Sequence, residues 1–531
     1  MRGVEEQILG AAFYARHATT HRGETMIGKT KEYGVVYTPE WIVDLILDNT
    51  VQEYKPALKI CDPACGDGAF LARLVERICD TVPARDCRRA LENLAGFDID
   101  AGALAQCRTR IDAVLVAKGK RLKINWNLHC MDSADRASLA PHEGRFDCVV
   151  GNPPYVRIQH LGEVRRRRMR RDWKLANRGS ADLYIAFFEI GMFLLKRGGR
   201  LGYITPNTYA KTMAGQPLRR LIREQHGIAC LFDFGEHQLF DGATTYSLIT
   251  VLHKNDSRER FALYRYDGKR IVSKGLVSAS NLPTNRFWTL ESETTLRKIQ
   301  CIRSRGRPLG EIAGIHVGLQ TLADDVFILE KVGEESGVVV ALDARGREAR
   351  IESAVTRPIL KASLMKDGKD VKERIIIFPY IDGRLFAEAD FSERFPMAYR
   401  YMAKQKTQLL QRDKGKFDPG RWYAFGREFG LFETFGDKLI TSGMNKRPNF
   451  QKCPAPEYTF YSGYCVKPKS GVDMDALLAV LNSADMDFYI RHTSRDYQNG
   501  WKSYAKSFIQ DYGVPAAVAE RAQHEQASMW R

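Results

Sequence analysis

The chain has 531 residues, which is enough for two or three domains with well-formed cores. Its composition, with 44% hydrophobic and 27% charged residues, is that of a globular protein, and it contains no uninterrupted apolar run of the roughly 18 residues that a membrane span needs. Lysine and arginine total 81 against 64 acidic residues, and the resulting formal charge of +17 favours a polyanionic partner. The 11 cysteines form no Cys-x-x-Cys pair, so we expect reduced thiols in a cytoplasm and neither a bound metal nor a disulfide framework.

The N-terminal segment, residues 1–30, is polar and contains no apolar core of signal-peptide type, so nothing in it indicates secretion. We expect it to form a short helical or partly ordered extension. Helix-start signals follow, because Thr38 suits an N-cap and Pro39 suits the first helical turn, ahead of the apolar run from Trp41 to Leu47. The first regular element is therefore predicted to be a helix that begins at about residue 39.

Between residues 58 and 253, strand-like apolar segments alternate with helical ones. The expected strands lie near 58–61, 94–99, 124–130, 146–150, 200–205, 228–234 and 247–253, and the expected helices near 69–79, 111–117, 183–195 and 217–225. Alternation at this spacing is typical of an α/β fold with a doubly wound, mostly parallel sheet. We assign residues 31–290 to this domain, with a trailing hairpin and a connecting helix at about 257–300. Residues 291–531 are irregular and rich in glycine, basic and aromatic residues, and they are predicted to form a separate α+β domain.

A glycine-rich turn follows the first predicted strand, in the sequence Asp-Pro-Ala-Cys-Gly-Asp-Gly-Ala-Phe. Gly66 and Gly68 permit positive φ and a close approach of the backbone to a ligand. Asp62 and Asp67 stand where the phosphates of a dinucleotide would have to come, so the turn suits a cationic ligand instead. S-adenosyl-L-methionine, with its sulfonium and ammonium groups, meets that requirement.

Acidic residues also end the next two predicted strands. Asp98 can accept hydrogen bonds from both ribose hydroxyls of a nucleoside ligand, and Asp100 is a competitor for that role. Asp132, with Ser133 beside it, can accept the adenine amino group of the cofactor, although it suits an ordinary loop or N-cap position equally well.

The segment Asn152-Pro153-Pro154-Tyr155 follows the fourth predicted strand. Two consecutive prolines fix φ and remove two backbone donors, so the chain leaves the strand along one stiff path. The segment thereby presents an amide and an aromatic ring at the carboxyl edge of the sheet, where α/β proteins bind ligands. An amide oxygen accepts a hydrogen bond from an exocyclic amine, and a tyrosine ring stacks on a base. A stiff loop without further function is the alternative, because Asn-Pro and Pro-Pro are common in turns.

The glycine-rich turn together with Asn-Pro-Pro-Tyr resembles the gamma, TaqI-like group of N6-adenine DNA methyltransferases. Tyr37-Thr38-Pro39 resembles the most N-terminal cofactor motif of that family, and its place ahead of the glycine-rich turn defines the gamma order. Further segments that resemble the family are 182–184, 195–200 and 204–207, so the likeness spans about residues 31–255. It implies a Rossmann-like, S-adenosylmethionine-dependent methyltransferase domain that belongs to a restriction-modification system.

The resemblance also implies roles for individual residues. It implies cofactor contacts from Tyr37, Thr38, Pro39, Asp62, Pro63, Ala64, Gly66, Gly68, Phe70, Asp98, Ile99, Asp132, Ser133, Asn152 and Pro154. The target adenine is flipped out of the duplex, Tyr155 stacks on it, and Phe240 packs against it from the side. Asn152 and the carbonyl of Pro153 accept the two amino hydrogens, so that catalysis rests on positioning and dipoles and requires no metal. Phe240 taken alone suits a core position as well.

Basic residues outside the motifs are candidates for DNA contact. The run Arg165, Arg166, Arg167 and Arg168 lies just after Asn-Pro-Pro-Tyr and is predicted to contact phosphates, the alternative being a solvated helix face. Lys446, Arg447 and Lys502 lie near aromatic residues in the C-terminal part, which resembles the specificity domain of the family more weakly. The sequence does not indicate which residues contact bases.

The expected function is therefore sequence-specific methylation of adenine in double-stranded DNA, by a chain that is monomeric on DNA and has no membrane association. A separate cognate restriction endonuclease is an open partner. A protein-glutamine or RNA N-methyltransferase would share the Asn-Pro-Pro-Tyr site, but such enzymes usually lack a large basic C-terminal domain. A bifunctional restriction and methylation enzyme and a DNA-binding module with an inactive methyltransferase fold are further alternatives. The intact motifs argue against the inactive module.

Overall fold

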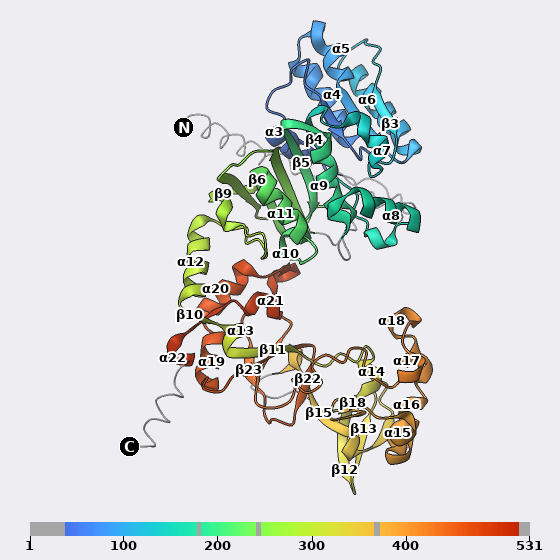
Figure 1. Ribbon diagram of the computed structural model, residues 1–531, viewed down its shortest axis with the longest axis vertical. Helices are drawn as coiled ribbons and strands as arrows, with labels where there is room; N and C mark the ends of the chain where they lie inside the picture. The colour runs from blue at the N-terminus through green and yellow to red at the C-terminus, as the bar shows by residue number, and fades with distance from the viewer. Residues whose placement is uncertain (1–37, 178–181, 241–245, 366–371, 520–531) are drawn as a thin grey trace. The chain divides into compact units, whose positions relative to one another are not determined.

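The computed structural model describes residues 38–177, 182–240, 246–365 and 372–519 (Figure 1). Tyr37 and the predicted extension 1–30 lie outside the described residues. The chain divides into two compact units, Met1–Leu296 and Arg297–Arg531. No helix within the described ranges is long and apolar enough to cross a membrane.

One sheet of nine strands organises the first unit, in the order β3-β2-β1-β4-β5-β7-β6-β8-β9. Its strands are β1 (Ile60–Asp62), β2 (Leu94–Asp98), β3 (Asn127–Cys130), β4 (Phe146–Gly151), β5 (Leu195–Pro206), β6 (His226–Gln238), β7 (Tyr246–Lys254), β8 (Arg260–Tyr266) and β9 (Ile271–Ser278). The neighbours from β3 to β5 are all parallel. β7 lies between β5 and β6 and is antiparallel to both. The predicted parallel α/β sheet is confirmed over its first five strands, and β7 departs from it.

Helices cover both faces of this sheet. They are α3 (Glu40–Thr50), α4 (Ala69–Thr81), α5 (Ala84–Glu92), α6 (Ala101–Ala117), α7 (Arg136–Leu139), α8 (Glu163–Asp172), α9 (Leu183–Leu194), α10 (Thr208–Lys211) and α11 (Gln216–Gln225). Alternate residues of one strand enter different cores: Cys148 and Val150 pack with α3, α4 and α6, whereas Val149 packs with α9. A strand buried on both faces reads as a continuous apolar run, which is why the sequence signal for β4 was strong.

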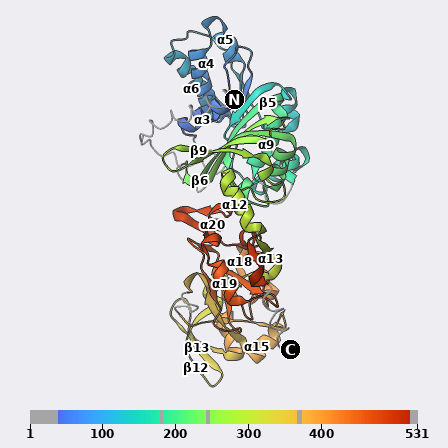
Figure 2. The same cartoon turned by 90° about the vertical axis from the view of Figure 1, so that its left-hand side faces the viewer.

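Two local predictions need correction. Thr38 does not cap the first helix: α3 begins at Glu40, Pro39 is its N-cap residue, and no side chain caps it. The hairpin predicted to trail the domain, β8–β9, is instead part of the sheet, because β8 pairs in parallel with β6. Figure 2 shows this sheet after a turn of 90°.

The second unit mixes helices with mostly antiparallel sheets, as expected for an α+β domain. A six-stranded sheet has the order β14-β13-β12-β16-β15-β22 and a four-stranded sheet the order β11-β23-β19-β21. The strands are β10 (Gly306–Pro308), β11 (Ala313–Val317), β12 (Ile328–Glu335), β13 (Val338–Leu342), β14 (Glu348–Glu352), β15 (Thr356–Lys361), β16 (Arg374–Ile377), β17 (Tyr380–Ile381), β18 (Arg384–Leu385), β19 (Leu439–Ser442), β20 (Met444–Asn445), β21 (Phe450–Lys452), β22 (Thr459–Tyr461), β23 (Gly463–Pro468), β24 (Asp496–Tyr497), β25 (Trp501–Ser503) and β26 (Gly513–Pro515). A buried aromatic cluster around Trp422 and Phe425 packs against the larger sheet.

Short helices complete the second unit. Helix α12 (Glu293–Ser304) crosses the boundary between the units. The others are α13 (Leu309–Ile312), α14 (Asp324–Phe327), α15 (Glu388–Arg394), α16 (Pro396–Ala403), α17 (Lys406–Leu410), α18 (Arg412–Gly415), α19 (Met474–Leu481), α20 (Ala484–Thr493), α21 (Lys506–Ile509) and α22 (Ala516–Ala519). Both views show the tip of the β12–β13 hairpin at the opposite end of this unit from α20 (Figures 1 and 2).

Candidate active site

The glycine-rich turn joins β1 to α4 and lies at the carboxyl edge of the first sheet. Gly66 and Gly68 both have positive φ, at 53° and 85°. A Cβ on Gly68 would come within 2.5 Å of the Sγ of Cys107 on α6, whereas a Cβ on Gly66 would meet nothing within 4 Å. Gly68 is therefore required for helix packing, whereas Gly66 suits its positive φ and has open space where a Cβ would stand.

Two carboxylates of this edge have no cationic partner among the described residues. Asp62 is buried, and its Oδ1 accepts a hydrogen bond from the backbone N–H of Ala64 at 3.1 Å. Burial raises the pKa of the Asp62 carboxyl to about 8, and the charge of Asp98 adds to the rise. Asp67, by contrast, accepts a hydrogen bond from Nη1 of Arg110 at 2.9 Å. Because a carboxyl with a pKa of about 8 is mostly protonated at pH 7, Asp98 rather than Asp62 supplies the negative charge that the sequence indicated.

Asp98 and Asp100 have different structural roles. Oδ2 of Asp98 accepts the backbone N–H of Gly66 at 2.9 Å, so the end of β2 is tied to the glycine-rich turn. Asp100 caps helix α6, with its Oδ1 accepting the N–H of Gly102 at 2.7 Å. Ile99 lies between them with 45% of its surface exposed, an apolar side chain beside two acidic ones. Of the two aspartates, Asp98 is the one that adjoins the turn.

The loop after β3 brings Asp132 and Ser133 to the same edge. The buried hydroxyl of Ser133 donates to the carbonyl of Pro63 at 2.6 Å and so holds this loop against the glycine-rich turn. Asp132 accepts two hydrogen bonds from Arg165, at 2.8 Å from Nε and 3.0 Å from Nη2. A residue predicted to bind cofactor is therefore paired with a residue predicted to bind DNA.

The remaining arginines of helix α8 are largely engaged as well. Arg167 pairs with Glu163 one turn away, and Arg168 lies 3.5 Å from Asp135. Arg166 donates to the carbonyl of Gln159 at 3.4 Å. Carboxylates of the protein compensate much of the positive charge of these arginines. This agrees better with a solvated helix face than with a phosphate-binding run.

Asn152 stands where β4 leaves the sheet. A Cβ on the preceding Gly151 would come within 2.6 Å of Oδ1 of Asp62, so only glycine allows the ends of β1 and β4 to approach this closely. The Asn152 amide nitrogen donates to the hydroxyl of Thr38 at 3.1 Å. Its Oδ1 is buried and has no hydrogen-bond partner among the described residues. An unpaired buried acceptor costs about 1–3 kcal/mol, so this oxygen is arranged to receive a donor.

Tyr155 is half-buried between the two cores of the first unit. Its hydroxyl donates to the carbonyl of Ile204 at 3.3 Å, and burial raises the pKa of that hydroxyl well above its usual range. The ring meets Tyr184 and Phe240 edge-on, with centroid distances of 6.3 and 6.5 Å. Phe240 is 4% exposed and belongs to the core, which supports its alternative assignment as a core residue rather than a contact of the target base.

Other residues predicted for the site differ in how they are placed. Thr38 and Pro153 are buried, Pro154 is half-buried, and Phe70 is buried in the core of α4 rather than turned towards the loop. The sequence did not predict two contacts of the site: the carbonyl of Ile204 accepts from Tyr155, and the hydroxyl of Thr38 accepts from Asn152. A backbone carbonyl leaves no signal in a sequence. Thr38 was interpreted as a helix cap because it precedes a proline.

Three basic residues predicted for DNA contact lie in the second unit. Lys446 and Arg447 are exposed, and Nζ of Lys446 lies 5.9 Å from the centroid of the Trp501 ring. Lys502 is different: its amine is paired with Asp496 and donates to the carbonyl of Arg491 at 3.1 Å, and its side chain is 13% exposed. Lys502 was predicted to contact DNA, and in the folded chain its charge is paired with Asp496.

A known protein family matches the part of the chain that contains this edge of the first sheet. Residues 92–240 match the family described as Eco57I restriction-modification methylase. Over these residues the chain is similar to Eco57I-type restriction-modification methylases. That range includes Asp98, Asp132, Asn152 and Tyr155, so most of the residues gathered at this edge lie within the matched range. The likeness to methyltransferases implies S-adenosyl-L-methionine as the methyl donor.

Individual relatives extend the likeness beyond the methylase domain. The chain is 25% identical to the type II methyltransferase M.BstVI of Geobacillus stearothermophilus, over 91% of this chain and 90% of that protein. It is 26% identical to the type II methyltransferase M.PaeR7I of Pseudomonas aeruginosa, over 94% and 89%. It is 27% identical to the type II restriction enzyme and methyltransferase RM.Eco57I of Escherichia coli, over 77% of this chain but only 49% of that enzyme.

A solved structure shares the fold. The type IIL restriction-modification enzyme MmeI, determined in complex with DNA, aligns with a TM-score of 0.59 at 13% identity, over 89% of this chain and 65% of that one. At this level of identity the likeness concerns the fold alone.

Proposed function

We propose that this protein is a site-specific DNA methyltransferase that transfers a methyl group from S-adenosyl-L-methionine to the N6 amino group of a flipped-out adenine in double-stranded DNA. It acts as the protective methylase of a restriction-modification system. The observation that carries the proposal is the buried Oδ1 of Asn152, which has no partner among the described residues and whose amide is held by Thr38.

The residues at the sheet edge fit the cofactor. Gly66 has open space where a Cβ would stand, Asp62 and Asp98 have no cationic partner within the described part of the chain, and Ile99 offers an exposed apolar surface for an adenine ring. Asp98 takes the ribose hydroxyls, because it is bonded to the glycine-rich turn through the N–H of Gly66, whereas Asp100 caps α6. S-adenosyl-L-methionine, when bound here, would supply an electrophilic methyl group, and its positive charge would favour the ionised form of Asp62, whose pKa of about 8 is raised by burial.

Asn152 and Pro153 act on the amino group of the target base. Oδ1 of Asn152 accepts one amino hydrogen and the carbonyl of Pro153 accepts the other. These bonds draw the nitrogen out of conjugation with the ring and localise its lone pair for in-line attack. Because Thr38 holds the Asn152 amide in place, the acceptor needs little reorganisation during the reaction.

Tyr155 holds the flipped base. Its hydroxyl is engaged by the carbonyl of Ile204, so the ring is fixed in orientation and offers a face for stacking. Stacking offsets part of the few kcal/mol that removal of a base from the duplex costs. Phe240 supports the ring of Tyr155 from its edge.

The descriptions of the relatives support methylation as the activity of this chain. The two that it matches over about nine-tenths of both lengths are described as methyltransferases, and RM.Eco57I is described as a restriction enzyme and methyltransferase. Protein-glutamine and RNA methylation remain the alternatives to be tested.

The test is to incubate the purified protein with S-adenosyl-L-methionine and genomic DNA and to map N6-methyladenine at single-base resolution. We expect methylation at one short sequence, and its loss in Asn152→Ala. Asn93→Ala is the matched control, because Asn93 is bound to the carbonyl of Pro56 at 2.8 Å, outside the residues gathered at the sheet edge. Methyl transfer to RNA or to a protein amide, with none to DNA, would contradict the proposal.

A further inference from the structure

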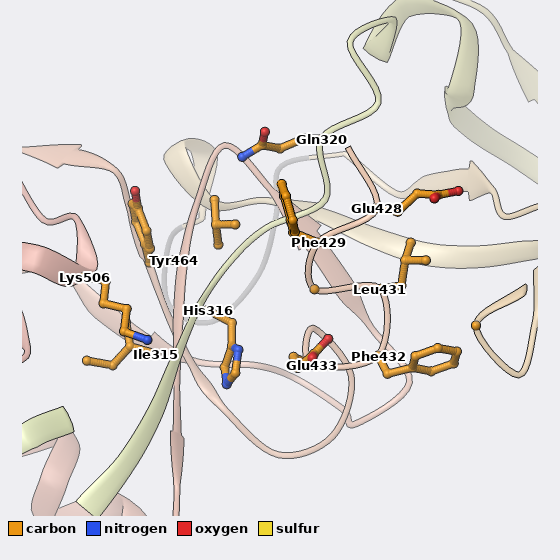
Figure 3. A pocket seen from close by; sticks show the side chains of 13 residues that line it. Ile315, His316, Gln320, Glu428, Phe429, Leu431, Phe432, Glu433, Tyr464 and Lys506 are labelled. Carbon is orange, nitrogen blue, oxygen red and sulfur yellow. The ribbon is translucent and has the colours of Figure 1, made fainter. Parts of the chain in front are cut away.

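The second unit contains a hollow of about 720 Å³ between strand β11 with the residues after it and the loop 428–433 (Figure 3). One wall comes from Ile315 to Gln320 and the other from Glu428 to Glu433, with Tyr464 and Lys506 at one side. The two walls are more than a hundred residues apart in the chain.

The loop that forms the second wall is firmly held. Gln320 and Arg427 form an isolated antiparallel bridge, with the N–H of Arg427 donating to the Gln320 carbonyl at 3.0 Å. Gly430 has φ of 74°, and a Cβ there would stand 3.1 Å from the carbonyl of Val317. Leu431 is buried and anchors the loop from beneath. Its outward side chains are thus displayed from a fixed backbone.

Those outward side chains are large and apolar. Phe429 is 71% exposed and Phe432 is 50% exposed. No other aromatic ring packs against Phe429 within the described ranges. A phenyl ring held in water on a rigid loop is unfavourable unless it meets a partner, so its exposure indicates a contact surface.

Polar side chains line the same hollow. Gln320 and Glu433 are exposed, and neither side chain has a hydrogen-bond or ion-pair partner among the described residues. The ring of His316 is close enough to Glu433 and Lys506 for their charges to act on its pKa, in opposite directions. The pKa of His316 is nevertheless lowered, chiefly by burial, so the imidazole is neutral at pH 7.

We propose that this hollow reads base edges in the major groove of double-stranded DNA, with Gln320 and Glu433 as specificity-determining residues and Phe429 as an apolar contact. The inference rests on the proposed function and deepens it by naming the residues that select the sequence. Glutamine forms a bidentate pair with adenine, a carboxylate accepts the amino group of cytosine, and a phenyl ring contacts the methyl group of thymine.

The charges of the hollow favour bases over phosphates. Its lining contains Glu428, Glu433 and Lys506, and Glu428 is paired with Arg421 at 2.6 Å. The remaining charges of Glu433 and Lys506 balance, so no net positive charge attracts the phosphate backbone to the hollow. Exposed cations such as Lys446 and Arg447 are better suited to contact phosphates. The residues that position the DNA and those that recognise its bases are therefore different residues of this unit.

The experiment measures which sequences the full-length protein methylates in a library with randomised bases. Gln320→Ala, Glu433→Gln and Phe429→Ala are compared with the wild type, after their melting temperatures and cofactor binding have been checked. We expect the preference of each variant for the correct base over other bases to fall roughly 5- to 150-fold at one or two positions of the site. Each variant should therefore also methylate sites that differ from the wild-type site at those positions.

Two exposed residues outside the hollow serve as matched controls. Val332→Ala removes a side chain that is 64% exposed on the β12–β13 hairpin, and Gln300→Ala removes an exposed glutamine on α12. Both are expected to keep the wild-type site spectrum.

The possible failures are distinguishable. If the wild type methylates a defined sequence and the three variants retain its spectrum, the inference is wrong and the proposed function stands. If the variants lose affinity equally for all sequences and the salt dependence becomes weaker, the hollow contacts phosphates and the inference is also wrong. If the wild type methylates no DNA, the proposed function fails and the inference fails with it.

Discussion

The edge of the first sheet and the hollow of the second unit are both proposed to meet nucleobases, but they are built in opposite ways. At the sheet edge the important groups are buried: Asp62 is 2% exposed, and the Oδ1 of Asn152 is inaccessible. In the hollow the important side chains stand in solvent, with Phe429 71% exposed. Transition-state stabilisation gains from a desolvated, preorganised site, because electrostatic interactions are stronger there. Recognition of a DNA sequence needs exposed side chains, because the protein must contact the base edges of many wrong sites before it binds the right one.

The largest effect is expected at the buried acceptor. Asn152→Ala should lower turnover by about 10²–10³-fold or more, because an acceptor aimed at the reacting amino group stabilises the transition state more than the ground state. Cofactor affinity and DNA affinity should stay within a few-fold of the wild type. Single-turnover kinetics and binding titrations separate the two quantities. If Asn152→Ala kept a normal rate of methyl transfer but bound DNA poorly, Asn152 would be a DNA-binding residue, and the contrast between a catalytic sheet edge and a base-recognising hollow would be wrong.

The next effect concerns Asp62 and pH. Its folded-state pKa of about 8 lies above the ordinary value of 3.8, so the folded protein retains a proton that the unfolded chain has lost. The stability contribution of this group is therefore complete below pH of about 4 and is lost progressively as the pH rises towards 8, at about 1.4 kcal/mol for each unit of pKa difference. Asp62→Asn should remove this slope from the free energy of unfolding in the cofactor-free protein. Denaturant titrations from pH 5 to 8 measure it, and parallel curves for both proteins would contradict the expectation.

Tyr155 should show a smaller effect that depends on the ring. Tyr155→Ala should cost on the order of 1–3 kcal/mol of base stacking. Tyr155→Phe keeps the ring and loses only the hydrogen bond to Ile204, which is worth about 0.5–1.5 kcal/mol. A fluorescent base analogue at the target position reports flipping separately from methyl transfer. Equal damage from both substitutions would mean that the hydroxyl, not the ring face, is responsible.

The smallest effect distinguishes free cations from paired ones. Lys446→Ala and Arg447→Ala should each reduce the slope of log affinity for DNA against log salt by about one, since both side chains are exposed. Arg165→Ala should change that slope less and should change cofactor affinity instead, because Arg165 is bound to Asp132. Binding assays at several salt concentrations test the comparison. An equal change in slope for all three variants would show that the Arg165–Asp132 pair opens on DNA.

Several features were readable from the sequence alone because their causes are local. Residues 62–70 and 152–155 contain glycines and prolines whose backbone restrictions do not depend on distant neighbours. Apolar runs and helix periodicity arise within single segments, which is why all seven expected strands of the first unit overlap strands of the sheet. The helices were less complete, since α6 begins at Ala101 rather than near residue 111 and α5 was not expected. The family resemblance rests on the same short motifs and their order, and the match over residues 92–240 agrees with it.

Tertiary structure decided what depends on neighbours that are distant in the chain. β7 lies between β5 and β6, which the order of strands in the sequence does not show. Thr38 orients Asn152 instead of capping a helix, and the two residues are separated by 114 positions. Whether an aspartate or an arginine is free or paired is likewise a property of the folded neighbourhood, as Asp132 with Arg165 illustrates. The sequence does not show the hollow of the second unit, because its two walls come from separate segments that only the folded chain brings together.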